Sequence, residues 1–205
     1  MNTLGNRDDK ETFSQLISYL NSIAEIPEDE LELVGRFVRV VHLKKGELFI
    51  KAGEVPELSG FICKGLMRVF HIDENGRDFT KLFNREFDFV SSFAAFIERT
   101  ESHLNVEALE DTTVCVINYK TFRMFIDRHF CWLKIYVKSL EKFYVIKERR
   151  EGYLLWYDAK SRYGQFLRDF PGLEKRVAQY YIASYLGISP VSLSRIRASF
   201  AKKTG

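Results

Sequence analysis

The side chains best suited to a chemical role lie near the end of the sequence, in a run that can bind a polyanion. Residues 156–205 hold nine lysines and arginines against three acidic residues, a net charge of +6, whereas the rest of the chain carries −3. Within this run, Arg195 carries a guanidinium that can bind guanine bidentately. The asymmetry indicates that this segment meets a polyanion, with chance unevenness of charge as the alternative.

The spacing of residues around Arg195 predicts a helix-turn-helix. Ala183 is small enough for a second helix to cross closely, and Gly187 can adopt the positive φ that ends a helix sharply. Ser189 is a good N-cap and Pro190 a good first residue of the next helix. Such a unit places its second helix in the major groove of DNA, although a similar corner also occurs in helical bundles. The apolar positions that would join the two helices are Ile182, Leu186, Leu193 and Ile196.

Ten residues are candidates for contact with double-stranded DNA. Arg195 would read a base from the outward face of the second helix, whereas Arg197 and Lys202 suit phosphates. Gln179 and Tyr180, at the start of the first helix, can bond phosphate oxygens. The full set is Gln179, Tyr180, Ser189, Pro190, Val191, Ser192, Ser194, Arg195, Arg197 and Lys202.

The other reactive side chains show no catalytic or metal-binding arrangement. The three cysteines are widely spaced without a Cys-x-x-Cys pair, which predicts buried thiols in place of disulfides, zinc or an iron–sulfur cluster. The histidines form no His-x-His pair, which disfavours a metal-dependent cupin enzyme, and no phosphate-binding loop or Gly-x-Ser-x-Gly elbow occurs. We therefore expect a non-enzyme without a metal. These residues are Cys63, Cys115, Cys131, His42, His71, His103 and His129.

Composition and hydropathy indicate a globular protein. The 205 residues are 46% hydrophobic and 29% charged, enough for one large domain or two small ones. The first ten residues are polar and lack the apolar run of a signal peptide. The longest uncharged stretch, Val177–Ser194, contains a glutamine, four serines, a glycine and a proline, so it is not a membrane span. A cytoplasmic location is expected.

The elements that must position the C-terminal motif begin with two helical pieces in residues 12–41, separated at Pro27. From Val40 to Asn118 the apolar period changes to two, and turn signals recur every eight to twelve residues. Asn75-Gly76 is the strongest hairpin signal. Short strands at this spacing predict a sandwich or a jelly roll.

Residues 119–156 again have a helical pattern. Four apolar residues repeat at intervals of four, three and four, as in one seam of a coiled coil. The next seam positions are charged, so the seam spans about two heptads. Two interpretations remain open: an amphipathic helix lying on the β domain, or a helix that pairs with its copy in a homodimer. The seam residues are Leu133, Val137, Leu140 and Tyr144.

The remaining segment predicts three further helices, over residues 162–170, 176–186 and 190–203, with a stop at Pro171-Gly172. The expected fold is α+β. Residues 1–118 form an effector-sensing jelly-roll domain (a double-stranded β-helix) with N-terminal helices. Residues 119–156 form the linking and dimerisation helices, and residues 157–205 form the DNA-binding helix-turn-helix domain.

Several motifs, spread over about residues 30–205, resemble the Crp/Fnr family, the catabolite activator class of bacterial transcription regulators. The resemblance implies a cyclic-nucleotide-binding-type β-roll and a winged-helix-like DNA-binding domain whose wing is absent here. It also implies a homodimer on a palindromic operator, RNA polymerase as a partner, and a small-molecule effector. The motifs lie in residues 43–54, 60–70, 106–111, 176–179, 182–188 and 193–197.

The sequence departs from this family in the segment that would hold a cyclic phosphate. Ser91-Ser92 stands where members that bind cyclic AMP have Gly-Glu, and Glu101-Ser102-His103 falls near the position of their phosphate-binding arginine. Arg99 is a few residues out of register. Without a positioned guanidinium the main charge-assisted contact is lost, which argues against cyclic AMP binding in the family manner. The candidate effector pocket, which would take another ligand or none, comprises Ser91, Ser92, Arg99, Ser102 and His103.

The second helix also departs from the family. Pro190-Val191 replaces an Arg-Glu pair that reads bases in the catabolite activator, so the operator should differ. This replacement and the missing wing leave a second interpretation open. The chain would then be a ligand-sensing or protein-interaction module whose DNA-binding face has been retired.

Overall fold

The computed structural model describes the backbone of residues 7–204 and the side chains of residues 8–200. These residues form two units. The first comprises the chain up to Val69 together with Phe83–Lys142, and the second comprises Phe70–Leu82 and the chain from Phe143 onward. None of the helices in the described part of the chain has the length and apolarity needed to cross a membrane.

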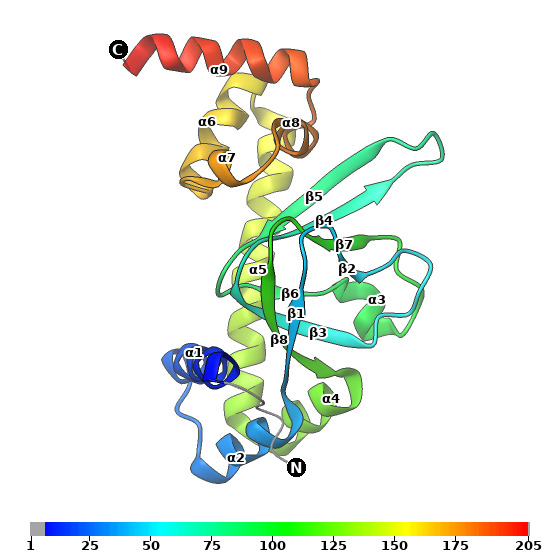
Figure 1. Ribbon diagram of the computed structural model, residues 1–205, viewed down its shortest axis with the longest axis vertical. Coiled ribbons are helices and arrows are strands. Elements are labelled where there is room, and N and C mark those ends of the chain that lie inside the picture. Colours follow the sequence, from blue (N-terminus) through cyan, green and yellow to red (C-terminus); the bar gives the residue numbers. More distant parts are fainter. Residues whose placement is uncertain (1–6, 205) are drawn as a thin grey trace. The chain divides into compact units, whose positions relative to one another are not determined.

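Two four-stranded sheets form the β-roll (Figure 1), which confirms the predicted jelly-roll type of fold. Their strand orders are β1-β8-β3-β6 and β2-β7-β4-β5, and neighbours in the first sheet are antiparallel. Asn75-Gly76 lies in the turn between β4 and β5, where Asp73 N donates to Arg77 O over 3.0 Å. The strands are β1 (Arg39–Leu43), β2 (Leu48–Ile50), β3 (Leu58–Lys64), β4 (Met67–Ile72), β5 (Asp78–Asn84), β6 (Phe89–Val90), β7 (Asn105–Ala108) and β8 (Thr112–Asn118).

Helices α1 (Arg7–Ile23) and α2 (Glu28–Phe37) flank the predicted break at Pro27. α1 packs on β1, β3 and β8 and covers the first sheet. The core between them consists of apolar side chains together with all three cysteines, which are buried and free, as expected from their spacing. Leu16, Leu20, Val34 and Phe61 are each less than 7% exposed.

A buried carboxylate joins three helices of this first unit. Glu30, in α2, is 2% exposed. Its carboxylate accepts from Arg128 Nε and from Trp132 Nε1, each over 2.7 Å. A buried charge requires such partners, because an unpaired carboxylate in the core would cost several kcal/mol, on the order of 3–5. Glu30 therefore fixes α2 against the two helices that follow the β-roll.

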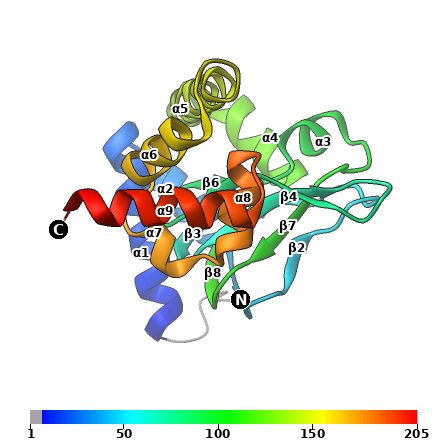
Figure 2. The same ribbon diagram turned by 90° about the horizontal axis from the view of Figure 1, so that it is seen from above.

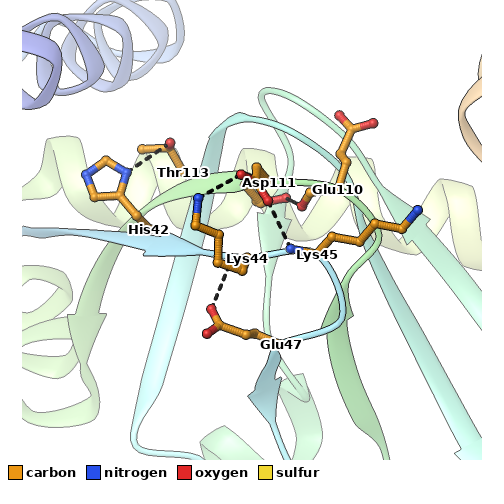
Figure 3. Close-up of polar contacts among 8 residues, drawn as sticks. His42, Lys44, Lys45, Glu47, Glu110, Asp111 and Thr113 are labelled. Carbon is orange, nitrogen blue, oxygen red and sulfur yellow. Dashed lines mark hydrogen bonds and ion pairs between the residues drawn. The ribbon is translucent and has the colours of Figure 1, made fainter.

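Polar contacts join the β1–β2 turn to the turn before β8 (Figure 3). Asp111 accepts from Lys44 Nζ over 2.9 Å and from the main-chain N of Lys45 over 3.1 Å, and Glu47 accepts from Lys44 N over 2.6 Å. The hydrogen bond and charge of Asp111 raise the pKa of Lys44, and the same contact lowers the pKa of Asp111. Residues 43–54, which carry one of the family-like motifs, are thus tied to the adjacent turn.

The helical segment predicted over residues 119–156 is interrupted. It forms α4 (Tyr119–Arg128) and α5 (Phe130–Trp156), and His129 between them is extended, with φ −140° and ψ 143°. The ring Nδ1 of His129 accepts from Cys131 N over 3.2 Å, which caps the start of α5. The apolar period continues through this break, so the pattern alone did not reveal it.

The second unit contains α6 (Ala159–Asp169), α7 (Leu173–Arg176), α8 (Gln179–Leu186) and α9 (Pro190–Thr204). α9 packs against α8 and α6 (Figure 2). The helix predicted over residues 176–186 is wrong in its first part. α7 ends at Arg176, and Val177 is extended at φ −114° and ψ 137°, with its side chain buried in the domain.

Gly65, between β3 and β4, provides a test of this fold. It has φ +104°, and an added Cβ would lie 2.7 Å from the main-chain Cα of Thr112. Gly46 also has positive φ, +87°, but has open space around it. We expect Gly65→Ala to destabilise the β-roll by about 2–4 kcal/mol, from strain plus overlap. Gly46→Ala should cost about 1 kcal/mol. Urea denaturation of both variants measures the difference, and equal losses would show that the β3–β4 turn is not packed as described.

Candidate nucleic-acid interface

The turn between α8 and α9 has the geometry that its sequence predicts. Gly187 ends α8 at φ +66°. Its N donates to Ser184 O over 3.1 Å, and Ile188 N donates to Ala183 O over 3.0 Å. This pair of bonds is a Schellman motif, which satisfies the last carbonyls of a helix while the chain reverses.

Ser189 caps α9, as its position before Pro190 predicts. Its Oγ accepts from Ser192 N over 3.2 Å and lies 3.0 Å from Ser192 Oγ. Leu193, one turn into α9, is fully buried, as is Ile182 in α8. The hydrogen bonds of the turn and these two buried side chains therefore hold α9 at a fixed angle to α8.

The outward face of α9 carries Val191, Ser194, Arg195 and Ala198, all exposed and spaced as one helical stripe. Pro190 and Ser189 are exposed at its start, whereas Ser192 and Arg197 are half-buried. Gln179 and Tyr180 are exposed in the first turn of α8, as phosphate contacts would require. Lys202 lies in α9 beyond the side chains that the structure describes.

Ser184 joins α8 to the β4–β5 hairpin, which belongs to the same unit. Its Oγ donates to Asp78 O over 2.9 Å and accepts from Thr80 N over 2.8 Å. One hydroxyl thus serves as both donor and acceptor for two main-chain groups of β5, 106 and 104 positions away in the sequence. Both bonds are made to main-chain atoms of the hairpin, so they do not depend on which side chains the hairpin carries.

Arg150, in α5, reinforces this junction. Its Nη2 donates to Tyr185 O over 2.8 Å and to Thr80 O over 3.3 Å. The guanidinium also lies 3.8 Å from the centroid of the Tyr185 ring. Burial lowers the pKa of Arg150, and burial raises the pKa of the Tyr185 hydroxyl. A cation at the last carbonyls of α8 is favourable because those carbonyls form the negative end of the helix.

Sequence analysis assigned no role to Ser184 or Arg150. A serine inside a helical motif and an arginine inside a charged run give no local signal of a partner. Only the folded chain shows what they bind. Their bonds connect the β4–β5 hairpin with the helix-turn-helix inside one unit. We call this network, made by Ser184, Arg150, Asp78, Thr80 and Tyr185, the hairpin junction.

Within the β-roll, the structure brings together two of the five predicted pocket residues. Ser102 Oγ lies 2.8 Å from Ser92 Oγ, and both residues are buried. Ser102 Oγ also lies 2.7 Å from Leu104 O and accepts from Leu104 N over 3.0 Å. Ser91 Oγ is buried without a hydrogen-bond partner in the described part of the chain. The two hydroxyls therefore satisfy each other at the positions where the family pattern has ligand-binding groups.

Arg99 contacts groups other than this pair of serines. Arg99 ends α3 (Phe93–Glu98) with φ +57°. Its guanidinium donates to Pro56 O over 2.6 Å, pairs with Glu57 and lies 4.8 Å from the centroid of the Tyr119 ring. His103 is exposed. The arginine nearest in sequence to the pocket is thus held by other groups.

Sequence analysis assigned no role to a second arginine of the β-roll. Arg68, in β4, is 2% exposed. It pairs with Glu107 of the neighbouring strand β7, at 2.8 Å from Nε and 2.7 Å from Nη2 to Oε1. A carboxylate this close neutralises much of the charge that a phosphate would need.

The predicted seam on α5 lies largely open. Leu133, Val137 and Tyr144 are 40%, 43% and 63% exposed, and Leu140 is half-buried. Phe130, one step earlier in the same repeat, is 73% exposed. The opposite face of α5 supplies buried residues to the core of the first unit, namely Cys131, Trp132 and Ile135.

Along this chain the β-roll is followed by a long helix, α5, and by the helix-turn-helix of α8 and α9. Residues 40–129 match the family model of the cyclic nucleotide-binding domain. The fold is similar to those of solved Crp/Fnr-family transcriptional regulators.

Three solved structures illustrate the likeness. FixK2 from Bradyrhizobium japonicum aligns with a TM-score of 0.70 and 17% identity over 82% of this chain and 86% of its own. A CooA variant from Carboxydothermus hydrogenoformans gives 0.70 and 20% over 92% and 85%. A CRP/FNR-family transcriptional regulator from Thermus thermophilus gives 0.65 and 18% over 80% and 87%. No curated protein sequence matches significantly.

The hairpin junction yields a prediction for main-chain dynamics. In Ser184→Ala, Thr80 N and Asp78 O each lose their hydrogen bond to the Ser184 hydroxyl, and loss of these two part-buried bonds costs about 1–3 kcal/mol in total. We expect amide hydrogen exchange in residues 78–82 to accelerate about tenfold or more, as such a loss implies. Ser199→Ala is the matched control, because Ser199 Oγ donates to Ile196 O of its own helix α9, over 2.7 Å. Unchanged exchange in Ser184→Ala would show that the hairpin is not held by α8.

Proposed function

We propose that the protein is a homodimeric, sequence-specific DNA-binding regulator of transcription of the Crp/Fnr type, acting in the cytoplasm on RNA polymerase. The observation that carries this proposal is α9. Its N-terminus is capped by Ser189, its inner face is fixed by Leu193, and its outer face presents Arg195 to solvent. A helix held in this way can enter the major groove without being remodelled.

Dimerisation through α5 follows from the two apolar faces of that helix. One face is buried in the first unit, and the other exposes Val137 and Tyr144 at heptad spacing. A helix that only lay on the β domain would need no second apolar seam. Pairing of two copies would cover the seam and set two α9 helices on successive major grooves, about 34 Å apart.

The candidate pocket residues of the β-roll support an effector other than cyclic AMP, or none. The Ser92–Ser102 pair offers neutral hydroxyls, and the buried Arg68 is already paired with Glu107. A cyclic phosphate placed there would lack a charge-assisted partner. The unpartnered hydroxyl of Ser91 leaves one polar group for an uncharged ligand to bond.

The second candidate function is a module that senses a ligand and contacts other proteins without binding DNA. The first turn of α9 favours it, since Pro190 and Val191 offer no hydrogen-bonding side chain to a base. On this alternative, the basic C-terminal segment would serve a different acidic partner.

Selection from a random double-stranded DNA pool at about 0.15 M salt distinguishes the two functions. We expect the ligand-free protein to enrich a twofold palindrome, because the pocket lacks the cyclic phosphate contact. Enrichment only when cyclic AMP is added would show that the pocket binds it by another route. The absence of an enriched sequence under either condition would favour the second function.

Arg195→Ala tests the base contact on the selected operator. Loss of a bidentate guanine contact should weaken binding by about 1–3 kcal/mol and relax the preference at one position of each half-site. Lys160→Ala is the control, because it removes an equal charge from an exposed position in α6. A filter-binding or fluorescence titration measures both. If Arg195→Ala binds as tightly and as selectively as the wild type, Arg195 does not read the operator.

Val137→Asp tests the dimer. A charge in the middle of an apolar seam should dissociate the two helices, because a buried unpaired carboxylate costs several kcal/mol, on the order of 3–5. Sedimentation velocity should show a dimer for the wild type and a monomer of 24.0 kDa for the variant. Lys138→Asp, exposed and off the seam, should remain dimeric. A dimer that survives Val137→Asp would place the interface elsewhere.

A further inference from the structure

The first turn of α9 presents an apolar surface to solvent at the end of the helix that would enter DNA first. Val191 is 61% exposed, and Pro190 beside it is also exposed. The two hydroxyls nearby are engaged with the helix end, since Ser189 Oγ accepts from Ser192 N and lies 3.0 Å from Ser192 Oγ. This turn therefore offers a base edge an isopropyl group and little hydrogen-bonding capacity.

Only one of the four bases matches such a group in the major groove. Thymine carries a 5-methyl group there beside its O4 acceptor, whereas guanine, adenine and cytosine have no methyl group that a valine could contact. The net charge of +6 in residues 156–205 supplies the attraction that brings a polyanion to this surface.

We propose that Val191 is a specificity-determining residue that contacts the methyl group of a thymine in each operator half-site. The assignment rests on the proposed function, because it requires α9 to lie in the major groove. Val191 lies one helical turn before Arg195, about 6 Å along the axis. Base pairs are spaced by about 3.4 Å, so the thymine falls within about two steps of the guanine read by Arg195.

The test removes apolar groups from each side of the contact in turn. In the operator enriched by selection, each thymine is replaced in turn by deoxyuridine, which lacks only the 5-methyl group. At one position per half-site we expect wild-type affinity to fall about fourfold, the value of one buried methyl group. Val191→Ala should lose a similar or larger factor on the unmodified operator, and should show no further loss with deoxyuridine at that position.

Ser194→Ala is the matched control, since Ser194 is exposed on the same face of α9. It should keep the full fourfold response to deoxyuridine. Val191 is exposed, so its replacement by alanine leaves the core of the helix pair intact.

Each outcome has a defined meaning. Fourfold losses that multiply in the combination of Val191→Ala and deoxyuridine would show independent contacts and overturn the assignment. An operator with no response to deoxyuridine at any thymine would also overturn it, while the proposed regulator function would stand. Failure to enrich any operator would overturn both.

Discussion

The hydroxyl of Ser184 is the contact on which the second unit depends. It bonds to a donor and an acceptor of the same strand, so it defines both the distance and the register between α8 and β5. The guanidinium of Arg150 donates hydrogen bonds to the same strand and to the end of α8. Because α9 leaves α8 at an angle fixed by the Gly187 turn, the position of the outward face of α9 relative to the hairpin follows from these few bonds.

The parts of the fold predicted from the sequence are those set by local chemistry. Gly187 permits the positive φ that ends α8, and the hydroxyl of Ser189 caps α9. Both effects act within a few residues, so the local sequence is enough to identify the turn. The alternation of apolar residues likewise marks the strands of the β-roll. The helix breaks at His129 and Val177 were not predicted, because each occurs inside a continuing apolar pattern. The first break is set by side-chain capping at His129 and the second by burial of Val177, and periodicity shows neither.

The candidate site was predicted unevenly for the same reason. The exposed stripe on α9 follows from the helical period once the helix is placed, and so does the seam on α5. Arg150 and Arg68 could not be found, because their partners lie 35 and 39 positions away. Nothing near either residue distinguishes it from an arginine on a solvated helix or strand. The family pattern located the segment holding Ser92 and Ser102, while the bond between them emerged only in the folded β-roll.

The Ser92–Ser102 pair has a consequence for how the β-roll can respond to its surroundings. Neither hydroxyl ionises in the range in which proteins are folded, so this pair carries no charge at any physiological pH. If a ligand replaced the hydrogen bond between the two serines, neither hydroxyl would take up or release a proton. Ionic strength would also leave their interaction nearly unchanged, since screening acts on charges. In this part of the molecule, shape and hydrogen-bond geometry alone would distinguish one small molecule from another.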